Sequence, residues 1–500
     1  MIKKILIANR GEIAVRVMRT ARELGIATVA VYSEVDVHAL HVQSADEAVN
    51  IGAAPASESY LNMDKLIDAA KATGADAIHP GYGFLSENPD FAERVRAAGL
   101  IFIGPPADSM RLLGDKIASR KLAEEHKVPI TRGAILEDIA NDKVLKVAES
   151  IGFPIMIKAT AGGGGKGMRV VHEPKELIAS FEAARREAQS AFGNPTVYLE
   201  KYIENPRHIE FQIFCDDHGN AIHLGERECS IQRRHQKIIE ESPSVVMTVE
   251  LRKRMGEAAI KIVKAAGYRN AGTVEFLYNN GEFYFMEVNA RLQVEHPVTE
   301  FVTGEDLVAW QIAIAAGEEL PKKQVEIHFR GHAIECRIYA EDPANQYLPS
   351  SGKILVLEEP QSPGVRVDSG IRQGSDVSVY YDPILSKVTT YSDTRERAIQ
   401  KMLSALNHYI LLGVRTPIEL LKDVLRHPEF KSGNLTTHFL NDHLPGWKPA
   451  SPDKKELARA LFAASQAAAA SQAKSNGGVP VMQTPWQTLG SWEIAKESLS

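Results

Sequence analysis

The chain has 500 residues, of which 24% are charged and 44% hydrophobic, with a formal net charge of −6. At roughly 100–200 residues per domain, this length predicts about three domains. The mixed, mildly acidic charge argues against a basic nucleic-acid-binding surface. The sequence has no run of about 18 apolar residues, so no membrane span is expected. Cys215, Cys229 and Cys336 form no CxxC pair, which predicts a reducing, cytoplasmic environment.

The first 110 or so residues predict a small doubly wound α/β domain. Residues 3–9 and 26–33 are apolar runs typical of buried strands, and apolar residues recur at helical spacing over 11–24. A strand, a helix and a second strand predict a right-handed βαβ unit. The pattern recurs, with helices expected at 62–73 and 89–98 and strands at 75–79 and 100–103.

Strand-like runs dominate after Gly114, where a second unit is expected to begin. A helix is expected at 250–266, followed by a hairpin of 272–278 and 283–289. Other strands are expected at 154–159, 168–171, 196–201, 208–215 and 221–224. The region 330–395 is rich in short strand-like runs, and a helix is expected at 394–408. Prolines then interrupt the chain near 445, and 454–474 is alanine-rich, which predicts an appendage outside the catalytic core.

A glycine-rich loop at 162–167 is the strongest local signal in the sequence. Five of its six residues are glycine and the sixth is Lys166, and Lys158 lies on the preceding strand. Glycine allows backbone N–H groups to approach an anion closely, so the loop could bind phosphate. A plain flexible hairpin loop is an equally good interpretation. The spacing excludes a P-loop, which needs GxxxxGK[ST] at the start of a helix.

The run 287–295 alternates polar and apolar residues, so its polar groups would line one face if it stays extended. An amphipathic edge strand would show the same pattern. Glu275 lies on the partner strand of a hairpin that turns near Asn280. An odd loop length would place Glu275 opposite Glu287, whereas a two-residue turn would place them on opposite faces. In the first register Glu275, Glu287 and Asn289 would form a cluster of oxygen ligands suited to Mg²⁺.

Two further segments carry polar groups. The segment 226–237 holds Arg233, Arg234, His235 and Lys237 close together, so it could be a solvated basic loop or a site for a small anion. The segment 79–88 follows a strand and marks a turn at the carboxyl edge of the first sheet, where ligands bind in doubly wound domains.

Taken together, these motifs resemble those of the biotin carboxylases, which are ATP-grasp ligases. The resemblance covers about residues 1–445. It is carried by the segments 5–14, 79–88, 162–167, 200–202, 232–237, 287–298, 330–338 and 339–343. It implies an N-terminal domain at 1–114, an ATP-grasp domain at 115–329 with a lid at about 131–203, a C-terminal mixed β/α domain at 330–445, and an extension at 446–500.

The resemblance also assigns roles to residues of this chain. Glu275, Glu287 and Asn289 would hold Mg²⁺ or Mn²⁺, and Glu295 would be the base that deprotonates bicarbonate. Arg337 would face the ureido oxygen of biotin. Bicarbonate would be held by Lys237, Arg291, Gln293 and Val294. ATP would be contacted by Lys116, Lys158, Gly164, Gly165, Glu200, Lys201, Tyr202, Ile203, His208, His235 and Glu275.

The implied reaction is the ATP-dependent carboxylation of biotin by bicarbonate through carboxyphosphate. No Ala-Met-Lys-Met biotinylation motif occurs in the sequence, so we expect biotin to arrive on a biotin carboxyl carrier protein. A carboxyltransferase subunit is expected to pass the carboxyl group to acetyl-CoA, propionyl-CoA, another acyl-CoA or pyruvate. The resemblance also implies a homodimer. The alternatives are another ATP-grasp ligase and a dehydrogenase, and the dehydrogenase is disfavoured because the first turn lacks GxGxxG.

Overall fold

The computed structural model describes residues 2–136, 141–159, 168–233, 236–450 and 462. The chain divides after Trp447, and Met1–Trp447 is the compact unit described below. The glycine-rich loop, His235 and the alanine-rich stretch at 454–474 apart from residue 462 lie outside the described residues.

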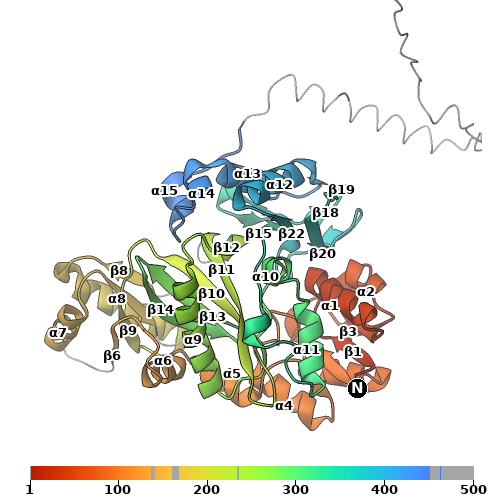
Figure 1. Ribbon diagram of the computed structural model, residues 1–500, viewed down its shortest axis with the longest axis horizontal. Helices are drawn as coiled ribbons and strands as arrows, with labels where there is room; N and C mark the ends of the chain where they lie inside the picture. The colour runs from red at the N-terminus through yellow and green to blue at the C-terminus, as the bar shows by residue number, and fades with distance from the viewer. Residues whose placement is uncertain (1, 137–140, 160–167, 234–235, 451–461, 463–500) are drawn as a thin grey trace, which may run out of the picture. The chain divides into compact units, whose positions relative to one another are not determined.

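The predicted doubly wound N-terminal region is confirmed as a parallel five-stranded sheet with the strand order β3-β2-β1-β4-β5 (Figure 1). Its strands are β1 (Lys4–Ile7), β2 (Ala27–Ser33), β3 (Glu47–Gly52), β4 (Ala77–His79) and β5 (Ile101–Phe102). The accompanying helices are α1 (Gly11–Glu23), α2 (Leu40–Ser44), α3 (Met63–Thr73), α4 (Pro89–Ala97) and α5 (Ala107–Gly114). The sequence did not predict β3 or α2, because β3 is an edge strand whose residues are mostly exposed.

A four-stranded antiparallel sheet with the order β6-β9-β7-β8 follows α6 (Lys116–Glu125). Its strands are β6 (Gly133–Leu136), β7 (Ile155–Ala159), β8 (Arg169–Val171) and β9 (Val197–Lys201). The helices α7 (Asn141–Ile151) and α8 (Pro174–Phe192) pack on it, and together they enclose a separate hydrophobic core that includes Ile157 and Phe181. A lid that moves as a unit would need a hydrophobic core of its own, and this region has one.

An antiparallel eight-stranded sheet with the order β14-β13-β10-β11-β12-β15-β22-β20 carries most of the candidate site. Its strands are β10 (Arg207–Cys215), β11 (Ala221–Arg233), β12 (Gln236–Ser242), β13 (Asn270–Asn279), β14 (Glu282–Asn289), β15 (His332–Tyr339), β20 (Val365–Ser369) and β22 (Ile384–Ser392). Because β12 pairs with β15, the sheet runs continuously across the predicted boundary at 329/330. The domain boundaries therefore stay a prediction.

Helices cover this sheet where its residues are apolar. The helix α9 (Val249–Ala265) lies against β10 and β11 in Figure 1, and it buries Met255 and Ile262. The helix α12 (Arg395–His408) begins at its N-cap Thr394 and packs on β15 and β22. The other helices are α10 (His296–Thr303), α11 (Leu307–Ala315), α13 (Ile418–Arg426), α14 (Pro428–Ser432) and α15 (Phe439–His443). The short strands are β16 (Glu341–Asp342), β17 (Leu348–Pro349), β18 (Gly352–Lys353), β19 (Val356–Glu358), β21 (Asp376–Val377) and β23 (Ile410–Leu412).

The segment 226–237 is mostly strand, so the interpretation as a solvated basic loop was wrong for its described residues. β11 continues to Arg233 and does not end at Leu224 as predicted. The side chain of Arg227 is fully buried, and Glu226 and Glu228 are each 1% exposed. These charges are neutralised by residues on β10 and on the helix α9, which a local charge pattern does not show.

The hairpin of β13 and β14 combines features of both registers considered. Asn279 pairs with Glu282, so the turn is the two-residue Asn280-Gly281 type. A bulge follows, because Phe276 pairs with Phe285 while Glu275 pairs with Glu287, leaving Met286 as the extra residue. With the two-residue turn alone, Glu275 and Glu287 would lie on opposite faces of the sheet. The bulge shifts the pairing by one residue and brings both side chains to the same face. It therefore puts Glu275 directly opposite Glu287.

Within the described residues, every helix is too short or too polar to cross a membrane.

Candidate functional site

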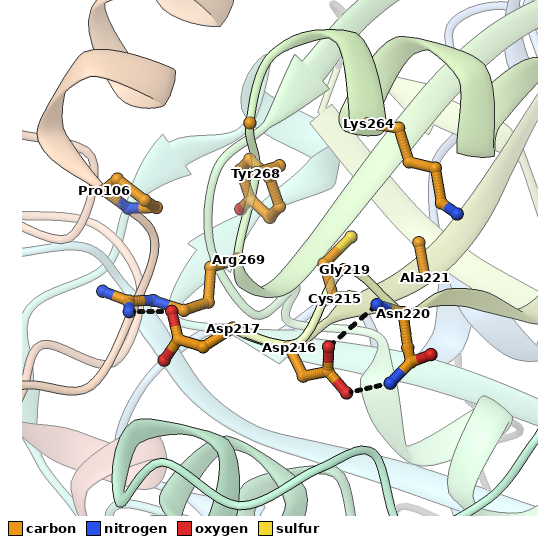
Figure 2. A pocket seen from close by; sticks show the side chains of 11 residues that line it. Pro106, Cys215, Asp216, Asp217, Gly219, Asn220, Ala221, Lys264, Tyr268 and Arg269 are labelled. Carbon is orange, nitrogen blue, oxygen red and sulfur yellow. Dashed lines mark hydrogen bonds and ion pairs between the residues drawn. The ribbon is translucent and has the colours of Figure 1, made fainter.

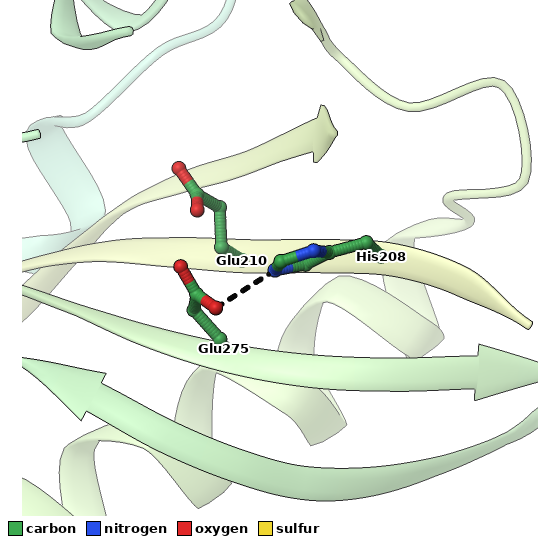
Figure 3. Close-up of side chains that lie close together, drawn as sticks. All are labelled: His208, Glu210 and Glu275. Carbon is green, nitrogen blue, oxygen red and sulfur yellow. Dashed lines mark ion pairs between the residues drawn. The ribbon is translucent and has the colours of Figure 1, made fainter. Parts of the chain in front are cut away.

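The site begins with a row of buried polar side chains on β10. His208, Glu210 and Gln212 alternate along the strand, so they share one face of the sheet. On the neighbouring strand Glu275 lies opposite Glu210. Figure 3 shows the side chains of His208, Glu210 and Glu275 gathered on this face. Nε2 of His208 lies 2.9 Å from Oε2 of Glu275, and this carboxylate outweighs burial and raises the pKa of His208.

Lys237 on β12 joins the carboxylates of this face. Its Nζ donates to Oε2 of Glu210 at 2.5 Å, to Oε1 of Glu275 at 2.9 Å and to Oε1 of Glu295 at 2.7 Å. The three carboxylates outweigh burial and raise the pKa of Lys237 well above its ordinary value. Lys237 is therefore a cation at neutral pH, and its side chain is 11% exposed.

Glu295 connects Lys237 to a second cation. Its Oε2 accepts a hydrogen bond from Nη2 of Arg337 at 2.9 Å. Burial alone would raise the pKa of Glu295, but Lys237 and Arg337 outweigh burial and lower it well below the ordinary value. Glu295 is thus fully buried and yet ionised. The ionised form is the one that can accept a proton at neutral pH.

Arg337 reaches this position from β15, several strands across the sheet. Its Nε donates to Oε1 of Glu240 at 2.5 Å, and its Nη1 contacts the hydroxyl of Tyr339 at 3.2 Å. Burial raises the pKa of Glu240 to about 7, although Arg337 opposes the shift. The guanidinium is therefore oriented by three partners, one on each nitrogen.

The predicted bicarbonate run 287–295 is not one extended strand. β14 ends at Asn289, and α10 begins directly after Glu295. The side chains still converge, because Arg291 contacts Oε1 of Gln293 at 2.9 Å and Oδ1 of Asn289 at 3.2 Å. The amide of Gln293 in turn lies 3.4 Å from Oε1 of Glu275. The polar side chains of the run converge as expected, but a turn of the chain brings them together, and the alternation of a strand does not.

The carboxylates of Glu275 and Glu287 fit the predicted divalent-cation site. They are cross-strand neighbours, and although Glu287 is exposed, the surrounding protein together with the charge of Glu275 raises its pKa. A divalent cation would offset this repulsion. Nδ2 of Asn289 donates to Oε1 of Glu275 at 2.9 Å, so the amide lies beside the pair. His208, Glu210 and Glu275 form a second group whose ligand atoms are close enough to hold an ion (Figure 3).

The predicted nucleotide residues lie around β7, β9 and the start of α6. Nζ of Lys158 is 2.5 Å from Oε2 of Glu200, and Arg120 contacts Oε1 of the same carboxylate at 3.1 Å. Lys116 is exposed at the first turn of α6.

The residues after Glu200 connect the lid sheet to the rest of the unit. The side chain of Lys201 donates to the carbonyls of Gly152 and Phe153, so its ammonium group is held within the lid. The hydroxyl of Tyr202 lies 2.8 Å from Nε2 of His438, and Ile203 is half-buried. Gly164, Gly165 and His235 are outside the described residues.

Sequence reasoning missed several residues that orient the site. Glu87, from the segment 79–88, accepts from Nε of Arg291 at 2.9 Å and from the backbone of Ala290 at 2.8 Å. Arg227 contacts Glu210 at 2.5 Å. The period-two row on β10 could have revealed Glu210, whereas the pairing of Arg227 is visible only once β10 and β11 are adjacent.

A cavity of about 420 Å³ lies at the other end of β10 (Figure 2). Cys215 lines it and lies seven residues along the strand from His208, which is about 24 Å at 3.4 Å per residue. The paired side chains of Arg269 and Asp217 also line it. This cavity is therefore separate from the polar cluster described above.

Three family models match consecutive parts of the chain. The model for the biotin carboxylase N-terminal domain matches residues 1–110. The model for the ATP-binding domain of the carbamoyl-phosphate synthase L chain matches residues 115–323. The model for the biotin carboxylase C-terminal domain matches residues 335–442.

Individual proteins match over most of the chain. A pyruvate carboxylase subunit of Methanothermobacter thermautotrophicus is 53% identical over 446 residues, which is 89% of this chain and 91% of that protein. The mitochondrial propionyl-CoA carboxylase alpha chain of Sus scrofa is 48% identical over 505 aligned residues, covering 98% of this chain and 68% of that protein. The second match therefore extends into the region after 446.

A solved structure shares the fold. It is the biotin carboxylase domain dimer of the Hydrogenobacter thermophilus 2-oxoglutarate carboxylase in complex with MgADP, ADP and bicarbonate. Its TM-score is 0.85 at 46% identity, and the match covers 90% of this chain and 100% of that one.

Proposed function

The chain belongs to the biotin carboxylase family and is a ligase for the ATP-dependent carboxylation of biotin, the first half-reaction of biotin-dependent carboxylases, and we propose that Lys237, Arg291, Glu295 and Arg337 carry out this reaction. The observation that carries the proposal is the position of Glu295. Its two carboxylate oxygens bridge Lys237 at 2.7 Å and Arg337 at 2.9 Å. The carboxylate of Glu295 thus lies between Lys237, a cation suited to binding bicarbonate, and Arg337, a cation suited to binding biotin.

Bicarbonate is a stable anion, and bringing it to a phosphate requires the site to offset charge. Lys237 supplies a fixed positive charge, and Arg291 supplies a planar guanidinium that can donate two parallel hydrogen bonds. Gln293 and the backbone of Val294 lie on the same turn. We infer that these four residues hold bicarbonate and that Glu295 accepts its proton. Because the groups are pre-oriented by Glu87 and Glu210, little reorganisation accompanies the reaction.

The residues for ATP and its metal surround this position. Glu275, Glu287 and Asn289 would hold Mg²⁺ or Mn²⁺, which supplies charge neutralisation for the phosphates when bound. His208 is held next to Glu275. On the lid, Lys158 with Glu200 and the backbone of Lys201, Tyr202 and Ile203 would contact the nucleotide, together with Lys116, Gly164, Gly165 and His235. Closure of the lid at about 131–203 would exclude water from a hydrolysable intermediate.

Arg337 is proposed to bind the ureido oxygen of biotin. Removal of a proton from the ureido nitrogen places negative charge on that oxygen, and a buried guanidinium stabilises it. We further propose that biotin is presented by a carrier domain or protein, that a carboxyltransferase acts next, and that the enzyme is a homodimer. The similar 2-oxoglutarate carboxylase domain is a dimer, and the three cysteines are free and buried, which fits a cytoplasmic location.

The proposal is tested by fixation of labelled bicarbonate onto free biotin by the Glu295→Gln variant. We expect carboxybiotin formation to fall at least about 100-fold, while ADP binding measured by calorimetry stays within twofold. Glu419→Gln is the matched control, because Glu419 is an exposed carboxylate paired with Lys422 on α13. Normal turnover in Glu295→Gln would refute its role.

A further inference from the structure

Lys387 on β22 is a fully buried lysine that none of the roles above uses. Its Nζ donates to the backbone carbonyl of Val294 at 2.5 Å. It also lies 3.6 Å from Oε2 of Glu12 and 4.0 Å from Oδ2 of Asp368. Burying a lysine costs several kcal/mol unless partners compensate. Within the described part of the chain the close hydrogen bond of Lys387 goes to a backbone oxygen, so its burial needs an explanation.

The strand register shows what Lys387 does beside Arg337. The two residues are direct cross-strand partners on β15 and β22, so both side chains project from the same face of the sheet. Arg337 contacts the carboxylate of Glu295, and Lys387 contacts the carbonyl of the residue before it. The adjacent side chains of Arg337 and Lys387 therefore hold Glu295 and Val294, two consecutive residues at the end of the run 287–295.

Like charges directly opposite each other repel, and the surrounding acids offset this repulsion. Asp368 pairs with Lys387 across the other neighbouring strand, and it is held ionised by Arg366 at 2.7 Å. Glu12 on α1 approaches from the N-terminal region, and neither of its oxygens makes a hydrogen bond within the described part of the chain. The two carboxyl groups thus lie 3.6 and 4.0 Å from Nζ of Lys387, while its hydrogen bond goes to the carbonyl of Val294.

We propose that Lys387 is a positioning residue that fixes the peptide between Val294 and Glu295 and thereby sets the affinity for bicarbonate. A peptide unit is planar, so holding the Val294 oxygen fixes the direction of the Glu295 amide and the start of its side chain. Among the described residues of the lid, the side chains of Lys158, Glu200 and Lys201 make their contacts elsewhere. Loss of Lys387 therefore weakens bicarbonate binding and leaves nucleotide binding intact. This inference rests on the proposed bicarbonate site.

The test compares Lys387→Met with wild type in bicarbonate-dependent ATP cleavage with free biotin. We expect the KM for bicarbonate to rise about tenfold or more, while the KM for ATP and the calorimetric Kd of ADP change less than twofold. Lys422→Met is the matched control, because Lys422 is a 9% exposed lysine of α13 paired only with Glu419. It should leave all three constants unchanged.

A second variant keeps the test decisive if Lys387→Met does not fold. Glu12→Gln with Lys387→Met removes both members of the buried pair, and it should fold and show the same rise in bicarbonate KM. An unchanged bicarbonate KM in either folded variant would overturn the inference, as would a parallel rise in both KM values. The proposed function has its own test, because it would fail if Glu295→Gln kept full carboxylation.

Discussion

Replacing Lys237 by methionine should destabilise the protein by an amount that depends on pH. Lys237 lies 2.5–2.9 Å from three carboxylates, those of Glu210, Glu275 and Glu295. One such pair at about 3 Å is worth roughly 5–6 kcal/mol before desolvation at an effective dielectric constant of about 20. Desolvation offsets most of this sum, so the net loss from removing the cation is about 3–5 kcal/mol at pH 8.

The pH dependence follows from the pKa shifts. Burial alone would raise the pKa values of Glu275 and Glu295, but both are lowered because Lys237, together with His208 for Glu275 and Arg337 for Glu295, outweighs burial. Groups with a lowered pKa stabilise the fold above their unfolded pKa of about 4.3, and they lose this contribution as pH falls through the folded pKa. Without Lys237, burial raises both pKa values, so the carboxyls take up protons at mildly acidic pH. The destabilisation by Lys237→Met should therefore be smaller at pH 5.5 than at pH 8.

The measurement is urea unfolding followed by tryptophan fluorescence at pH 5.5 and pH 8. Each unit of pKa rise in one carboxyl reduces the penalty at the lower pH by up to about 1.4 kcal/mol. The control Lys422→Met removes a lysine that pairs with the exposed Glu419, so its effect on the free energy of unfolding should be small and equal at both pH values. An equal loss for Lys237→Met at both pH values would show that packing, not charge, accounts for it.

Two other substitutions test separate parts of the site. Arg337→Ala should reduce biotin carboxylation about 100-fold and reduce bicarbonate-dependent ATP cleavage much less, and equal losses would contradict a biotin-specific role. Relative to wild type, the Glu12→Gln variant should become more stable as the pH rises from 5 to 8.5. The gain in the free energy of unfolding, measured in urea, should be about 2–3 kcal/mol. The reason is that burial raises the pKa of Glu12 from 4.5 to about 7, so wild type loses stability through this range while the amide does not. If the difference in unfolding free energy between wild type and Glu12→Gln does not change with pH, the raised pKa of Glu12 is ruled out as its cause.

Local apolar patterns predicted the elements around the site but not the contacts between them. The strands β1, β2 and β4 and the helices α1, α3 and α4 were predicted within about two residues, because each has a continuous apolar run or a helical apolar stripe. The edge strand β3 was missed because few of its residues are buried.

The site depends on features that lie outside such patterns. The register that joins Glu275 to Glu287 depends on a bulge at Met286, and no residue type there signals it. Arg227 is buried because its partner Glu210 lies on the next strand, and Lys387 because its partners come from α1, from β20 and from the turn before α10. The family resemblance named the four proposed reacting residues, but Glu87, Glu240 and Lys387 emerged only from the contacts.

The central claim is that this site joins bicarbonate to the γ-phosphate of ATP. It is tested most directly with ¹⁸O-labelled bicarbonate, ATP, Mg²⁺ and free biotin, followed by mass spectrometry of the released phosphate. Attack by bicarbonate predicts one ¹⁸O atom per phosphate in the biotin-stimulated turnover. Phosphate whose fourth oxygen comes from water, with no ¹⁸O, would show that the protein hydrolyses ATP without activating bicarbonate.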